Sequence, residues 1–181
     1  MGYTHFVAVI VPDDIADVIE TCRHWMAEKY GCVSGYRTAA HITLVQPFAL
    51  GDERGVSCLE DALGKWALDH RGFECEISGF GAFAERTVFA HVETASEWEL
   101  WHGDLVRAFN DVCPLMVPVD RRPFTPHLTV ANRDIPLGAV APSLLHFAEL
   151  DLHEKFFVDH AALFEWEAGA WKVRGQVECV L

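Results

Sequence analysis

His41-Ile42-Thr43-Leu44 and His127-Leu128-Thr129-Val130 share one pattern, in which a histidine and a threonine are separated by one aliphatic residue. Residues i and i+2 lie on the same face of a β-strand. Each tetrad therefore predicts a strand that presents an imidazole and a hydroxyl on one face and buries two aliphatic side chains on the other. Two such strands indicate the two halves of one acid–base site.

The repetition of this tetrad exceeds what the composition predicts. With ten histidines in 181 residues, chance gives about 0.1 tetrads, and the odds of two are roughly one in 200. The alternative is a pair of ordinary strands that happen to carry His and Thr. The two motifs also occupy corresponding places in the two halves of the chain, which favours a shared function.

The composition indicates one globular domain. Of the 181 residues, 51% are hydrophobic and 23% are charged, which is enough apolar material for a core. We expect residues 1–181 to form a single domain of two lobes, each contributing one His-x-Thr motif. No apolar run approaches the ~20 residues that cross a bilayer, and the N-terminus lacks the basic region and cleavage site of a signal peptide. We expect a cytoplasmic protein with no membrane partner, and a monomer.

The formal net charge is −13, from 27 acidic and 14 basic side chains. Proteins bind long nucleic acids chiefly by neutralising phosphates with Lys and Arg, so this charge argues against a long duplex nucleic acid as partner. It leaves room for a small anionic ligand or one RNA end in a locally basic pocket. Arg37 precedes the first motif, and Arg121, Arg122 and Arg133 bracket the second. We expect them to supply positive charge at the rim of the site; the alternative is that they only keep the surface soluble.

The cysteines and histidines do not form the patterns of a metal site. The six cysteines are scattered without a Cys-x-x-Cys pair, which suits free thiols in a reducing compartment. The ten histidines include no His-Glu-x-x-His motif. We therefore expect neither a metal nor a cofactor.

Hydrophobic periodicity predicts strands and helices along the whole chain. We expect strands at 6–11, 39–48, 73–77, 87–93, 127–130, 149–158, 161–167 and 171–181. We expect four helices: one that begins after Pro12, one that follows the first motif strand and ends at about residue 70, one that begins at Ser96 and one at about 138–148. Ser96-Glu97-Trp98-Glu99 has the form of a capping box. Each half of the chain runs motif strand, helix, strand, strand. This order predicts two similar lobes that bring the motif strands together across a cleft.

The tandem tetrads, with Thr125-Pro126 directly before the second, resemble the 2H phosphoesterase superfamily, in the branch of bacterial 2′-5′ RNA ligase and RNA 2′,3′-cyclic phosphodiesterase. The resemblance extends over 6–12, 40–48, 81–83 and 124–130. It implies an α+β fold of two pseudo-symmetric lobes, with antiparallel sheets facing a central cleft. One departure is that many members of this branch carry Arg five residues after the second His, where this chain has Asn132 followed by Arg133.

By this resemblance, His41, Thr43, His127 and Thr129 are the expected catalytic residues. Hydrolysis of a cyclic phosphodiester needs a base for water, an acid for the departing ribose oxygen and donors for the non-bridging oxygens. Histidine can serve as base or acid near neutrality, and threonine hydroxyls can donate without adding charge. The resemblance gives His127 the task of activating water and His41 that of protonating the leaving 3′ oxygen. Candidate substrate-binding residues are Arg133, Arg37, Phe124 and Arg122.

The leading hypothesis is thus a metal-independent phosphodiesterase that converts the 2′,3′-cyclic phosphates of RNA ends or small nucleotides to 2′-phosphates. An alternative within the superfamily is action on ADP-ribose cyclic phosphate or 2′-5′-linked oligonucleotides, including 2′-5′ RNA ligation. A non-catalytic nucleotide-binding module is a further alternative. The presence of His and Thr at all four motif positions argues against that last hypothesis.

Overall fold

The computed structural model of the protein describes residues 3–50, 53–114, 117 and 123–181. Within these ranges the strands are β1 (His5–Ile10), β2 (His41–Phe48), β3 (Phe73–Phe83), β4 (Thr87–Val92), β5 (His127–Asn132), β6 (His153–Val158), β7 (His160–Glu167) and β8 (Ala170–Glu178). The helices are α1 (Asp13–Tyr30), α2 (Glu53–Asp69), α3 (Ser96–Val112) and α4 (Val140–Phe147), with 3-10 turns η1 (Ser34–Arg37) and η2 (Ala148–Leu150).

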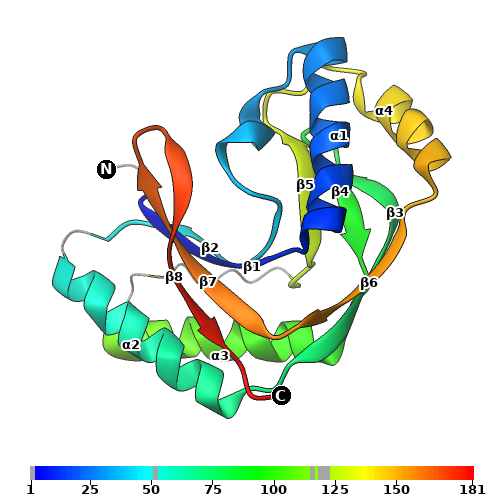
Figure 1. Ribbon diagram of the computed structural model, residues 1–181. Helices are drawn as coiled ribbons and strands as arrows, with labels where there is room; N and C mark the ends of the chain where they lie inside the picture. Colours follow the sequence, from blue (N-terminus) through cyan, green and yellow to red (C-terminus); the bar gives the residue numbers. More distant parts are fainter. Residues whose placement is uncertain (1–2, 51–52, 115–116, 118–122) are drawn as a thin grey trace.

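All eight of these strands join one antiparallel sheet in the order β6-β3-β4-β5-β2-β1-β7-β8 (Figure 1). The sheet has two four-stranded lobes that meet where β2 pairs with β5. We call them the β2 lobe (β2, β1, β7 and β8) and the β5 lobe (β5, β4, β3 and β6). Each motif strand is the innermost strand of its lobe. The predicted α+β class with two pseudo-symmetric antiparallel lobes is confirmed.

The lobes do not coincide with the two halves of the sequence. The β3–β4 hairpin comes from the first half but lies beside β5, while β7 and β8 come from the second half and extend the sheet beyond β1. β1 is buried along most of its length, and it has neighbours on both edges because β7 pairs with the edge that β2 leaves open. The two motif strands are therefore adjacent in one sheet, and do not face each other from separate sheets.

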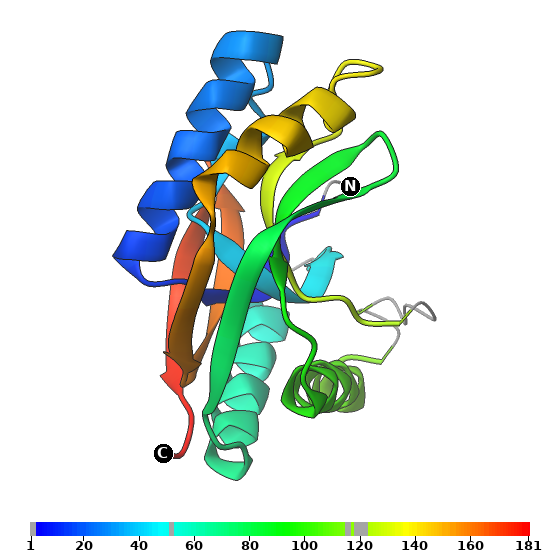
Figure 2. The ribbon, with the colours of Figure 1, turned by 90° about the vertical axis from the view of Figure 1, so that its right-hand side faces the viewer.

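Two helices cover each lobe on its outer side. The helix α1 packs on β5 and α4 packs on β3 and β4, whereas α2 and α3 pack on each other, with α3 on β2 and α2 on β7 and β8 (Figure 2). The apolar stripe of α1 is formed by Ile15, Ile19, Cys22 and Met26, all of which are buried. The capping-box prediction for α3 is wrong: Ala95 is the N-cap, and Ser96 already lies inside the helix, where its hydroxyl donates to Glu97.

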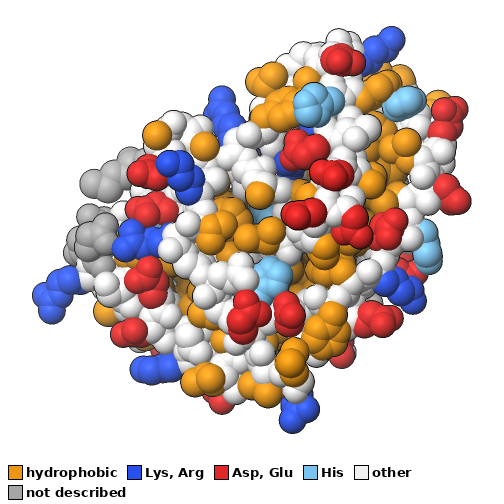
Figure 3. All heavy atoms as spheres, viewed as in Figure 1, with side chains coloured by type: hydrophobic (Ala, Val, Ile, Leu, Met, Phe, Trp, Pro, Cys, Tyr) orange, Lys and Arg blue, Asp and Glu red, His pale blue; other side chains and the backbone are white. Residues whose placement is uncertain are grey.

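The surface of the molecule reflects its acidic composition. Acidic side chains gather over α1 on the face shown in Figure 3. The first turn of this helix carries Asp13 and Asp14. Within the described ranges the cysteines carry thiols and form no disulfide. In the described ranges, no helix is both long and apolar enough to cross a membrane.

Candidate active site

The four motif side chains lie on one face of β2 and β5. The register pairs Ile42 with Leu128, so His41 lies opposite Thr129 and Thr43 lies opposite His127. Ile42 and Leu128 are fully buried beneath the sheet, while the four polar side chains are only partly buried. Diagonal neighbours on such a pair are separated by roughly 7–8 Å, which allows two imidazoles to flank one phosphate.

The two imidazoles are held in the same way. Nδ1 of His41 donates to the carbonyl oxygen of Ala39 at 2.8 Å, and Nδ1 of His127 donates to that of Thr125 at 2.8 Å. A carbonyl oxygen only accepts, so the ring hydrogen of each neutral histidine resides on Nδ1. In each ring, Nε2 is left with the lone pair that can take or return a proton.

Each histidine also packs against two phenylalanines. The ring of His41 lies 5.0 Å from Phe6 and 5.7 Å from Phe164, and that of His127 lies 5.0 Å from Phe83 and 5.4 Å from Phe89. These apolar walls restrict the rotation of the imidazoles and limit the water around them.

Burial shifts the pKa of both histidines downward. Loss of solvation lowers the pKa of His41 to about 4, opposed by the hydrogen bond to Ala39 and assisted by the charges of Arg23 and His127. Burial likewise lowers the pKa of His127, against the opposing effect of its bond to Thr125. Both imidazoles are therefore neutral near pH 7 in the ligand-free molecule.

Arg23 on α1 lies beside the motif strands, although it belongs to neither sequence motif. Its guanidinium is buried and donates to the carbonyl oxygens of Thr129 and Thr38, next to the two motifs. A signal for it exists in the sequence, because Arg23 follows Ile19 by four residues and precedes Met26 by three. These spacings put a charged side chain on the apolar stripe of the helix.

His91 on β4 is a second residue beside the motif strands that belongs to neither sequence motif. It pairs directly with His127 in the β4–β5 register, so the two imidazoles share a face of the sheet. Its Nε2 lies 3.7 Å from Glu93. Strand periodicity alone did not reveal it, because the pairing partner of β4 is not local in sequence.

The other candidate residues lie around these strands. Arg37 ends η1, and Arg133 follows β5 in a left-handed conformation with φ of 73°; both side chains are exposed. Phe124 stacks on His102 at 4.5 Å, and Nδ1 of His102 donates to the carbonyl oxygen of Leu44 at 2.6 Å. Arg121 and Arg122 lie outside the described residues. Binding roles for Arg37, Arg133 and Phe124 stay predictions.

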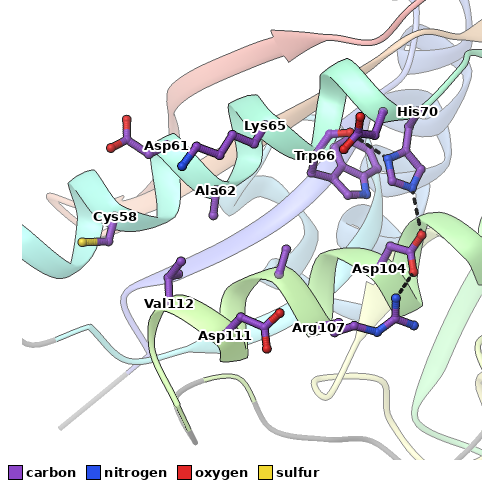
Figure 4. A pocket seen from close by; sticks show the side chains of 12 residues that line it. Cys58, Asp61, Ala62, Lys65, Trp66, His70, Asp104, Arg107, Asp111 and Val112 are labelled. Carbon is purple, nitrogen blue, oxygen red and sulfur yellow. Dashed lines mark hydrogen bonds and ion pairs between the residues drawn. The ribbon is translucent and has the colours of Figure 1, made fainter.

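A groove of about 610 Å³ lies away from the motif residues, between α2 and α3 (Figure 4). In it, His70 donates from Nδ1 to the carbonyl oxygen of Trp66 at 2.7 Å and lies 3.1 Å from Asp104 through Nε2. Arg107 donates to the other oxygen of Asp104 at 2.7 Å. These groups bond one another across the two helices, which is the arrangement of a structural brace. Across the described residues, no group of three or more His, Cys, Asp or Glu side chains is placed to hold a metal ion.

Comparison with known proteins identifies relatives of this arrangement. The sequence profile of the 2'-5' RNA ligase superfamily matches residues 11–170. The crystal structure of TT0787 of Thermus thermophilus is similar over 97% of both chains, with 19% identity and a TM-score of 0.73. That of E. coli LigT complexed with 3'-AMP is similar over 99% of both chains, with 17% identity and a TM-score of 0.69. A phosphoesterase structure covers 100% of both chains at 16% identity and a TM-score of 0.64. At these identities the structures establish the fold alone, and no curated protein matches the sequence.

Proposed function

Because the chain belongs to the 2'-5' RNA ligase superfamily of 2H phosphoesterases, we propose that it is a phosphoric diester hydrolase acting on 2′,3′-cyclic phosphates of RNA ends or nucleotides. The observation that carries this proposal is the pair of imidazoles on one face of β2 and β5. Each donates Nδ1–H to a carbonyl oxygen and keeps Nε2 for proton transfer. The product is a 2′-phosphate, and the reaction needs no metal.

In the proposed reaction, His127 takes a proton from a water molecule as the water oxygen attacks phosphorus. The bond between phosphorus and the 3′ oxygen breaks, and His41 gives a proton to that departing oxygen. The hydroxyls of Thr43 and Thr129 donate to the non-bridging oxygens, which gain negative charge in the transition state. Because β2 and β5 are hydrogen-bonded neighbours, the four groups are oriented before substrate arrives.

A lowered pKa keeps a histidine neutral near pH 7, which is the form that the base needs. The acid, in contrast, must carry a proton. A bound phosphodiester has one negative charge, and an anion next to an imidazole favours its protonated form. The substrate thus raises the pKa of the histidine beside the leaving oxygen. Substrate binding therefore shifts the pKa of His41 upward from its ligand-free value of about 4, toward the protonated form that the acid requires.

The surroundings of the imidazoles favour a nucleotide as substrate. Phe83, at the rim beside His127, has 40% of its surface exposed, and Trp171 packs on Phe6 beside His41. Nucleobases stack on such aromatic side chains. LigT has been crystallised with 3'-AMP, ATP and NADP+, and we propose small nucleotides or RNA ends here as well. The acidic surface over α1 disfavours a long duplex.

The remaining features of the active species are also proposed. Since one chain supplies both motifs, a monomer contains a complete site, and sedimentation at assay concentration tests this. The six scattered cysteines, without a Cys-x-x-Cys pair, suit a reducing compartment such as the cytoplasm.

The direct test is an assay of a panel of 2′,3′-cyclic nucleotides in the presence of EDTA, with product identification. We expect turnover that the chelator leaves unchanged, and 2′-phosphate products. Loss of activity in EDTA that a divalent ion restores would overturn the metal-free mechanism, and 3′-phosphates would reverse the direction of opening. Parallel assays with ADP-ribose cyclic phosphate and 2′-5′-linked dinucleotides separate the other superfamily activities. Binding to every member of the panel without turnover would indicate a non-catalytic module.

A further inference from the structure

We propose that Arg23 is a positioning residue, whose single guanidinium holds the backbone of both motif segments and so fixes the two histidines relative to each other. The catalytic consequence rests on the proposed function. The effect of Arg23 on the pKa of His41 can be measured without any substrate.

The guanidinium bridges the two halves of the site. Nε and Nη2 donate to the carbonyl oxygen of Thr129, at 3.3 and 3.1 Å, inside the second motif. Nη1 donates to the carbonyl oxygen of Thr38 at 3.0 Å, three residues before His41. The next carbonyl oxygen, that of Ala39, accepts the Nδ1–H of His41. One side chain is therefore bonded to the second motif strand and to the segment that orients the first histidine.

The surroundings of Arg23 fit a buried, charged guanidinium group. Only 3% of Arg23 is exposed, and Nη1 donates to Glu20 at 2.5 Å. A buried guanidinium is stable only when its donors are paired. A Cβ at Gly35 would lie 2.7 Å from the carbonyl oxygen of Val130 and 3.2 Å from Nε of Arg23, so only glycine lets η1 close over the guanidinium. An apolar residue would suffice for helix packing alone, as Ile19 shows on the same stripe.

The charge of Arg23 acts on His41 as well. The charged or titratable groups that act on His41 are Arg23 from α1 and His127 from β5, and both lower its pKa. From β1 and β7, His41 meets only the apolar rings of Phe6 and Phe164. Removing the guanidinium charge therefore raises the pKa of His41, while a lysine at position 23 keeps the charge but loses the bidentate geometry.

The test uses Arg23→Lys and the double variant Arg23→Gln/Glu20→Gln, which leaves no unpaired carboxylate. Glu20→Gln alone separates the loss of the ion pair from the loss of the guanidinium. Arg107→Gln is the control, because Arg107 forms a similar pair with Asp104 three residues away, but on the surface of α3. Histidine ring signals are titrated by NMR, kcat and KM are measured on a cyclic nucleotide, and unfolding is followed by temperature.

We expect the pKa of His41 to rise in the double variant and to stay low in Arg23→Lys. In both, kcat falls about 10–100-fold, as for a misplaced catalytic group, with little change in KM; the Arg107→Gln control keeps wild-type kcat. A folded Arg23→Lys with wild-type kcat, or a folded double variant with an unchanged His41 titration, overturns the proposal. So does a loss of kcat that only follows the unfolded fraction. If wild type hydrolyses no substrate, the proposed function fails while the NMR result still decides the role of Arg23.

Discussion

Around His41 both aromatic neighbours are buried, whereas around His127 one of them reaches the surface. Phe6 and Phe164 have 3% and 1% of their surface exposed, against 40% for Phe83. The β2 lobe thus encloses its histidine in apolar side chains, and the β5 lobe leaves one aromatic side chain exposed beside its histidine. The same backbone arrangement, with Nδ1–H bonded to a carbonyl oxygen two residues earlier, carries two different environments.

The neighbouring strands differ in the same sense. Ile10 of β1 lies opposite His41, while His91 of β4 lies opposite His127. Acid–base catalysis needs one protonated and one neutral histidine, so two identical environments would serve it poorly. The pseudo-symmetric backbone thus gives the two histidines equivalent places, and we propose that the unequal side chains around them separate their roles.

Removal of either histidine has the largest expected effect. His41→Ala and His127→Ala should each lower kcat by the ~10²–10⁴-fold typical of a general acid or base, with little change in KM. Steady-state kinetics on a 2′,3′-cyclic nucleotide measures this. The control is His153→Ala, an exposed histidine on β6. Loss of turnover in only one of the two variants, with full turnover in the other, would mean that the two lobes do not share one reaction.

The environment of His41 also predicts a pH dependence of stability. Its pKa is about 4 in the folded protein and its ordinary value is 6.5, so the unfolded chain binds more protons between these values. The free energy of unfolding is therefore fully retained above pH 6.5 and falls as the pH drops toward 4, by about 3 kcal/mol from this residue. In His41→Gln this part of the loss should vanish, as measured by urea unfolding at several pH values. Equal pH dependence in the variant and the wild type would show that His41 is not desolvated.

The threonines are expected to contribute less than the histidines. Thr43→Val and Thr129→Val each remove one hydroxyl donor to a charged oxygen, which should lower kcat/KM about 10–100-fold, partly through KM. Because Thr43 faces His127 and Thr129 faces His41 across the strand pair, comparable losses are expected from both lobes. A loss confined to one threonine would show that the phosphate rests on one lobe only.

The smallest expected effect concerns the open aromatic face. Phe83→Ala should raise KM for a cyclic nucleotide about 2–10-fold and leave kcat nearly unchanged, since it removes one stacking contact. Phe157→Ala on β6, where the ring is 50% exposed, is the matched control. If KM is the same for both variants, the nucleobase does not lie against the β5 lobe.

Local pattern predicts much of the site. The spacing of His41 and Thr43, with Ile42 between them, is enough to put the two polar groups on one face, because strand geometry alternates side chains. The helix α1 is equally predictable from its apolar spacing. The same tetrads and the Thr125-Pro126 pair carry the resemblance to the family, which the match over residues 11–170 confirms.

Features that depend on distant pairing cannot be predicted in this way. Nothing in an apolar run such as β1 specifies that it pairs with β7, about 150 residues further along the chain. The sequence therefore does not reveal that each lobe contains strands from both halves of the chain. The prediction of a capping box at Ser96 is wrong because a motif of four residues does not determine where the first turn of a helix begins. The spacing of Arg23 marks it as a charge on the apolar stripe of α1, but its carbonyl partners cannot be predicted, because they lie beside η1 and in β5, which only the folded chain brings to α1.

The central claim is that the histidines of the two lobes play opposite parts in one reaction, and a change of leaving group tests it most directly. A nucleoside phosphodiester with a highly acidic leaving group needs little protonation as that group departs. We expect His41→Ala to recover much of its lost rate on this substrate, while His127→Ala stays slow. The opposite pattern would exchange the two roles, and equal slowness of both variants would contradict the division of labour between the lobes.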